Sequence, residues 1–126
     1  MASKLLLVED DQVLRDLYLT RFKMEGYDVD VATDGETALA QAGASIPACI
    51  LLDLRIPKLS GFEVLRRLKE QPATKDIPVI VLTALSGDED RQKVMQLGAK
   101  AFLTKAETMP KDVLAHVREA IGPAAN

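Results

Sequence analysis

The chain has 126 residues, a net charge of −3 and one cysteine, and 48% of its residues are hydrophobic. This length suits one domain with its own core, the weakly acidic balance argues against nucleic-acid binding, and a lone cysteine excludes an intrachain disulfide framework. The apolar run at residues 5–8 is too short for a signal peptide or a membrane span. We therefore expect a cytoplasmic protein that binds neither nucleic acid nor membrane.

The first half of the chain alternates short apolar runs with amphipathic segments. Residues 5–8 predict a buried strand, and the next segment has helical spacing of apolar residues up to Gly26, which suits a C-terminal cap. Residues 27–32 alternate valine with aspartate, as in a strand near a sheet edge. A capping-box pattern at residues 33–36, with Thr33 as its first residue, predicts a short helix, and the apolar run from Cys49 predicts a central strand.

The second half repeats this alternation. Capping-box patterns occur again at residues 60–63 and 86–89. Strand-like runs occur again at residues 78–83 and 101–105. The helix that follows Ser86 offers only Val94, Met95 and Leu97 as apolar residues, so we expect it to be loosely held. Pro110 lies in the first turn of a final helix.

Five strands alternating with five helices through short connections predict an α/β fold. Parallel strands with right-handed crossovers place helices on both faces of the sheet. The flavodoxin-like, doubly wound order 2-1-3-4-5 buries the three most apolar runs centrally. We expect one domain at residues 1–122 and a flexible C-terminal tail at residues 123–126.

Polar residues end four of the predicted strands. In this fold those ends lie on one rim of the sheet, where ligands bind, and they bring together Glu9, Asp10, Asp53, Thr83 and Lys105. Clustered carboxylates require a cation, and Mg²⁺ prefers such hard oxygen ligands. A lysine and a hydroxyl add groups that stabilise phosphoryl oxygens, so that Asp53 can be a nucleophile forming an aspartyl phosphate.

Each of these residues alone is more often a cap, a turn residue or a solvated surface charge. Their coincidence at the ends of separate strands favours a joint site. Asp11 we assign mainly to capping the first helix, with a metal role as the minority view. His116 we assign to the surface, and Cys49 to the buried core.

Four stretches resemble the receiver domain of two-component response regulators: L-L-L-V-E-D-D, L-L-D-L-R-I-P-K-L-S-G, V-I-V-L-T-A and A-F-L-T-K. The similarity covers nearly the whole chain. It implies a metal-binding acid pair, Glu9 and Asp10, and a phosphoacceptor, Asp53, that also binds Mg²⁺. It further implies a metal ligand from the backbone carbonyl of Arg55, phosphoryl contacts from Thr83 and Lys105, and a switch formed by Thr83 and Phe102.

The sequence departs from this family at three positions. Ala106 follows Lys105, where the family usually has a proline after a cis peptide bond. A cis bond before a non-proline residue costs about 3–4 kcal/mol, so we expect a trans bond. Phe102 lacks the hydroxyl of the tyrosine found in many relatives, and Ser60 replaces a frequent aspartate as a helix cap.

The resemblance implies a stand-alone receiver that accepts a phosphoryl group on Asp53 from a sensor histidine kinase or a histidine phosphotransfer protein. The phosphoryl group is expected to draw the Thr83 hydroxyl inward and Phe102 to turn toward the interior. The signal then leaves through protein contacts with an unknown downstream target. We expect a monomer that can dimerise when phosphorylated, without turnover of an external substrate.

Two alternatives remain open. A receiver-like scaffold regulated by protein contact alone would be expected to lose some of the acids, Thr83 or Lys105, and this chain retains them. An aspartate-nucleophile phosphatase usually has a second carboxylate two residues after the nucleophile, where this chain has Arg55. No glycine-rich nucleotide-binding motif is present, and the acidic loop after the first strand would repel the phosphate of a flavin.

Overall fold

The computed structural model describes residues 3–122, so the predicted tail at residues 123–126 lies outside the described residues. Strands and helices alternate strictly: β1 (Lys4–Val8), α1 (Gln12–Met24), β2 (Asp28–Ala32), α2 (Gly35–Ser45), β3 (Cys49–Leu52), α3 (Gly61–Glu70), β4 (Val79–Thr83), α4 (Asp88–Gln96), β5 (Ala101–Thr104) and α5 (Pro110–Ile121). Among the described residues, no helix is long and apolar enough to cross a membrane.

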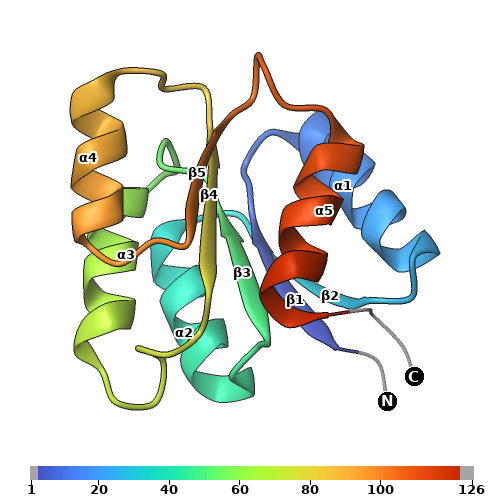
Figure 1. The fold of residues 1–126 in the computed structure, drawn as a ribbon. Coiled ribbons are helices and arrows are strands. Elements are labelled where there is room, and N and C mark those ends of the chain that lie inside the picture. The colour runs from blue at the N-terminus through green and yellow to red at the C-terminus, as the bar shows by residue number, and fades with distance from the viewer. Residues whose placement is uncertain (1–2, 123–126) are drawn as a thin grey trace.

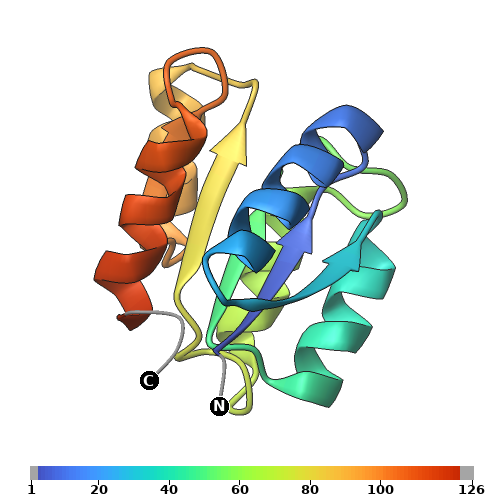
Figure 2. The same ribbon diagram turned by 90° about the vertical axis from the view of Figure 1, so that its right-hand side faces the viewer.

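All strands pair in parallel, in the order β2-β1-β3-β4-β5, which confirms the predicted flavodoxin-like sheet (Figure 2). The strand at residues 27–32 lies at one edge, as its alternating pattern predicts. The chain leaves β1 toward β2 on one side and returns to β3 on the other. This reversal occurs at the carboxyl ends of β1 and β3, and sheets of this kind bind their ligands at such a point.

Helices cover both faces of the sheet, with α2, α3 and α4 on one face and α1 and α5 on the other (Figure 1). Alternate residues of β4 divide between the two cores: Val79 and Val81 pack toward α2–α4, and Ile80 and Leu82 toward α1 and α5. A strand covered on both faces must be apolar throughout. The continuous apolar runs in the sequence therefore correspond to the central strands.

The predicted N-cap residue is confirmed for one of the three capping-box patterns and is wrong for the other two. The Ser60 hydroxyl accepts a hydrogen bond from the N–H of Glu63 at 3.3 Å, as predicted. The cap of α2 is Asp34 rather than Thr33, because the extended backbone at Asp34 presents its carboxylate to the first turn. The cap of α4 is Gly87 rather than Ser86, and no side chain bonds there.

Helix α4 has few apolar anchors, as its composition predicts. Val94 is fully buried, Leu97 is half-buried, and Met95 is 44% exposed. The last helix, α5, starts at Pro110 as expected and buries Val113 among other apolar residues. Helix α4 therefore buries fewer apolar side chains against the sheet than α5 does.

The loop between β3 and α3 folds tightly against the end of the strand. The Gly61 N–H donates to the Leu54 carbonyl at 2.9 Å. A Cβ atom at position 61 would lie 2.5 Å from both the Asp53 carbonyl oxygen and the Leu54 Cα. Glycine at this position therefore allows α3 to start directly against the backbone that carries Asp53.

Replacing Gly61 by alanine should lower the free energy of unfolding by about 2 kcal/mol, because the added methyl overpacks a closed site. Urea unfolding followed by circular dichroism measures this change. Gly43→Ala is the matched control, because a Cβ there has no atom within 4 Å and Gly43 is inside a helix. That variant should gain about 0.5 kcal/mol. Equal stability of the two variants would contradict the packing argument.

Candidate functional site

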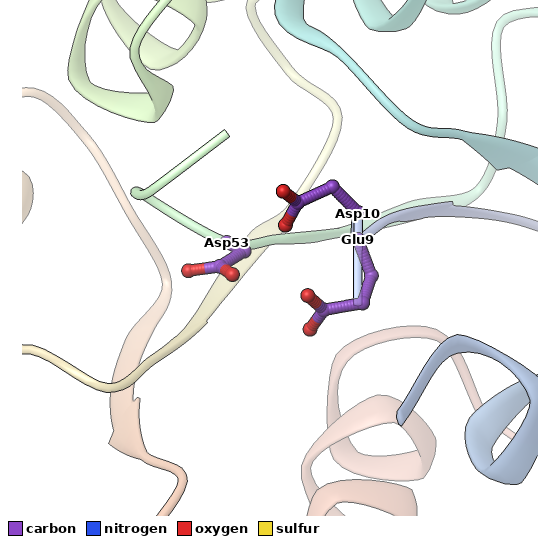
Figure 3. A group of neighbouring side chains, drawn as sticks. All are labelled: Glu9, Asp10 and Asp53. Carbon is purple, nitrogen blue, oxygen red and sulfur yellow. The ribbon is translucent and has the colours of Figure 1, made fainter. Parts of the chain in front are cut away.

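Three carboxylates meet at the ends of the two central strands. Glu9 and Asp10 follow β1, Asp53 follows β3, and β1 and β3 are paired neighbours. The Asp53 N–H donates to the Val8 carbonyl at 3.1 Å and so continues the pairing beyond β3. One oxygen from each carboxylate lies within 4.8 Å of the others (Figure 3). The sequence predicted this convergence from strand order alone.

Lys105, which follows β5, supplies the counter-charge. Its Nζ lies 2.8 Å from Glu9 Oε1 and donates to Asp53 Oδ2 at 2.9 Å. Glu9 is 2% exposed and Asp53 4%, whereas Asp10 is exposed. The Lys105 N–H also donates to the Thr83 carbonyl at 2.8 Å, which holds the start of this loop to β4. The predicted lysine therefore reaches the acids from across the sheet.

The pKa values reflect burial and close charges. Burial raises the pKa of Glu9, and the negative charge of Asp53 raises it further, although Lys105 opposes the shift. Burial alone would lower the pKa of Lys105, but hydrogen bonds and charge from Glu9 and Asp53 outweigh it and raise that pKa. The acids thus keep Lys105 protonated, while Glu9 bears the cost of its buried charge.

The donor set suits a divalent metal ion. Three carboxylates and one ammonium leave two excess negative charges in a small volume. Close carboxylates favour a cation, and carboxylate oxygens are the ligands preferred by Mg²⁺ and Ca²⁺. The group formed by Glu9, Asp10 and Asp53 can therefore bind a metal. The predicted metal contact from the Arg55 carbonyl stays a prediction.

Backbone groups orient the acids. The Arg55 N–H donates to Asp53 Oδ1 at 3.2 Å, so both Asp53 oxygens accept a hydrogen bond. The Asp11 N–H donates to Glu9 Oε2 at 3.2 Å, and the Asp11 side chain accepts from the Leu14 N–H at 3.1 Å. Asp11 is the N-cap of α1, which confirms its predicted capping role.

Thr83 and Phe102 face the same side of the sheet. Thr83 is fully buried, and its hydroxyl oxygen accepts from the Leu85 N–H at 3.3 Å. Phe102 is 4% exposed and belongs to the core beneath α4. The ring therefore lies in the interior of this structure, and the switch formed by Thr83 and Phe102 stays a prediction. Burial of the aromatic surface is sufficient reason for this position.

The bond between Lys105 and Ala106 is trans, as predicted, since the described residues contain no cis peptide bond. The chain turns just after β5, where the Glu107 N–H donates to the Thr104 carbonyl at 3.2 Å. Lys105 nevertheless reaches Glu9 and Asp53. A proline after the lysine is therefore not needed to direct this side chain toward the acids.

Two further residues lie away from the acids. Cys49 is fully buried, as predicted, and burial raises the pKa of its thiol to about 12. His116 is half-buried and lines a cavity of about 150 Å³ beside Lys100 and Glu119. Among residues 3–122, neither belongs to a group of three metal-ligating side chains. Neither residue therefore contributes to the metal site.

Sequence reasoning missed two contacts between α4 and aromatic rings. The Arg91 guanidinium lies 4.9 Å from the centre of the Phe102 ring, and Lys93 Nζ lies 4.4 Å from that of Phe62. Arg91 precedes the buried Val94 by three residues, a spacing that places both on one helix face. That spacing is the signal that could have connected Arg91 with the core.

Comparison with known proteins identifies the family. Residues 5–118 match the model of the response regulator receiver domain. The chain therefore belongs to the receiver-domain family of two-component response regulators.

Three known proteins illustrate the similarity. The response regulator PleD of Caulobacter vibrioides is 43% identical over 105 residues, which are 83% of this chain and 23% of PleD. The receiver domain of sensor histidine kinase PA1611 from Pseudomonas aeruginosa PAO1, solved with a magnesium ion in its active-site cleft, has a TM-score of 0.88 at 29% identity, covering 97% of this chain and 99% of that one. Chemotaxis protein CheY4 of Vibrio cholerae has a TM-score of 0.87 at 28% identity, with 95% and 99% covered. The chain spans about half or less of the length of the curated relatives it matches.

Glu9→Gln should stabilise the metal-free fold near neutral pH while weakening Mg²⁺ binding about tenfold. Because the folded-state pKa of Glu9 is raised, its charge opposes folding above that pKa, and this penalty disappears below the unfolded value. The Tm advantage of Glu9→Gln should therefore shrink as the pH falls through the Glu9 pKa. Thermal unfolding across pH and calorimetric Mg²⁺ titration measure the two effects.

Asp11→Asn is the matched control, because asparagine is an equally good cap and the backbone N–H to Glu9 is kept. Its Mg²⁺ affinity should stay close to that of the wild type. If Asp11→Asn lost more Mg²⁺ affinity than Glu9→Gln, Asp11 rather than Glu9 would be a metal ligand.

Proposed function

We propose that this chain is a phosphorylation-dependent signalling receiver that accepts one phosphoryl group on Asp53 in a Mg²⁺-dependent reaction. The observation that carries the proposal is the contact of the buried Asp53 with the half-buried Lys105, beside Glu9 and Asp10. Family membership and the magnesium-bound receiver of PA1611 support it. The donor would be a sensor histidine kinase or a histidine phosphotransfer protein.

In the transfer, a carboxylate oxygen of Asp53 forms a bond to phosphorus as the phosphorus–nitrogen bond of the donor phosphohistidine breaks. The electron pair of that bond stays on the imidazole. Glu9, Asp10 and Asp53, with the Arg55 carbonyl, would hold the Mg²⁺, and the bound ion would supply positive charge to neutralise the phosphoryl oxygens. Lys105 is already within hydrogen-bonding distance of Asp53 and can follow the transferred group with little movement.

Thr83 is the proposed second contact to the phosphoryl group and the start of the switch. Among the described residues its hydroxyl oxygen accepts one hydrogen bond, from the Leu85 N–H, and the hydroxyl has no acceptor for its own proton, so it can donate to a new one. A phosphoryl oxygen that accepts a hydrogen bond from this hydroxyl would fix Thr83 toward Asp53. Phe102, on the same face of the sheet, would then be held in its inward position.

The output is proposed to be protein contact with a downstream target, without turnover of an external substrate. The proposal includes a cytoplasmic location, where the protein would meet its phosphohistidine donor. A stand-alone monomer is part of the proposal: the chain covers 99% of the CheY4 chain but only 23% of PleD. Dimerisation on phosphorylation is part of the proposal, and size-exclusion chromatography with and without the phosphoryl group tests it.

The two alternatives receive less support. A scaffold without phosphorylation does not require a half-buried lysine shared between two buried acids, an arrangement that is costly unless it has a use. A phosphatase needs a general acid near the nucleophile. Two residues after Asp53 this chain has Arg55, an exposed cation.

The wild type should gain the mass of one phosphoryl group when incubated with Mg²⁺ and acetyl phosphate, and Asp53→Asn should gain none. Lys105→Ala should slow the reaction about a hundredfold, because one preorganised cation at the transferred group is lost. Intact mass spectrometry over time measures both. The matched controls are Asp28→Asn for Asp53→Asn and Lys100→Ala for Lys105→Ala. Each changes an exposed residue of the same type, and both variants should react as the wild type does.

Absence of an adduct on the wild type, or an undiminished adduct on Asp53→Asn, would refute the proposal. Saturable Mg²⁺ binding without any adduct would instead favour the scaffold. Hydrolysis of an added phosphoester over many turnovers would favour the phosphatase.

A further inference from the structure

The ring of Phe102 has a cation over one of its faces. The Arg91 guanidinium lies 4.9 Å from the ring centre, although Arg91 itself is exposed. The ring shares its core with Val94, one turn further along α4, and with Val81 of β4. Arg91 therefore covers the solvent side of an aromatic residue that the core holds from within.

Within residues 3–122, Phe102 is the one aromatic ring with which Arg91 makes a cation–π contact. Three acids open α4, yet no carboxylate of residues 3–122 lies within ion-pair distance of Arg91. A guanidinium over an aromatic face is attracted by the ring quadrupole, and the attraction is lost when the ring leaves. Arg91 thus favours the inward position of Phe102 specifically.

The ring is also a neighbour of Thr83. Phe102 pairs with Val81, and Thr83 pairs with Thr104, so Thr83 and Phe102 are diagonal neighbours across β4 and β5 on one face of the sheet. Side chains at such positions are within reach of one another when one is aromatic. The positions of Thr83 and Phe102 are therefore coupled by shared space.

We propose that Arg91 is a positioning residue that holds Phe102 inward before phosphorylation and thereby makes the site more receptive to a phosphoryl group. This inference rests on the proposed function of Asp53 and Thr83. Any contact that favours the conformation bound by a ligand strengthens the binding of that ligand. The switch in this chain is thus partly set in advance by α4.

The same helix provides an internal control. Lys93 lies over Phe62, a residue of α3, at 4.4 Å, and it carries the same charge as Arg91. Lys93→Met removes one cation from α4 without touching Phe102. Arg91→Met removes one cation and leaves an apolar side chain that can still cover the ring. Arg91→Lys keeps the charge.

The experiment combines two measurements on these variants. The chain has three phenylalanines, so 4-fluorophenylalanine labelling gives three fluorine NMR signals, and the inward and outward populations of Phe102 can be followed. Titration with beryllium fluoride and Mg²⁺, a stable mimic of an acyl phosphate, gives the affinity of the site.

Arg91→Met should lower the inward-to-outward ratio of Phe102 about threefold relative to Lys93→Met. It should also lower the affinity for beryllium fluoride, by no more than about threefold, because only the fraction of molecules with Phe102 inward binds the mimic well. Arg91→Lys should restore both values toward the wild type. Equal ring populations and affinities in Arg91→Met and Lys93→Met would overturn the inference while leaving the proposed function intact. Failure of the wild type to bind the mimic would overturn both.

Discussion

The contact of one half-buried ammonium with two buried carboxylates is the constraint on which the rest of this structure depends. Charges removed from water are tolerated only when they are paired, and Lys105 pairs with both Glu9 and Asp53. These groups come from the ends of β5, β1 and β3. The pairing of these charges therefore depends on the sheet order, which brings the three strand ends to one rim.

The same contact explains why the site is ready for ligands without large movement. Asp53 is oriented by the N–H of Arg55 on one oxygen and by Lys105 on the other. Gly61 keeps α3 close behind it. A metal ion or a phosphoryl group therefore meets donors that are already in place, which is the condition for efficient charge stabilisation.

The two proposed switch residues near the rim lie on one face of the sheet. Thr83 and Phe102 both face α4, the helix with few apolar anchors, whereas α5 on the opposite face is firmly packed. A segment with little buried surface responds to small changes in its contacts. The cation of Arg91 over Phe102 shows that polar contacts supplement hydrophobic burial in holding this helix to the sheet.

Apolar runs and helical spacing in the sequence determined the alternation of elements, the sheet order and the rim residues, because strand ends in a parallel sheet share one edge. Local patterns were insufficient at Thr33 and Ser86, where the neighbouring residue became the cap because the path of the chain decides which group meets the first turn. Only the tertiary structure decided that Lys105 reaches both Glu9 and Asp53, that Phe102 already lies inward and that Arg91 covers it. These features depend on distances between side chains far apart in the sequence, and no local pattern encodes such distances.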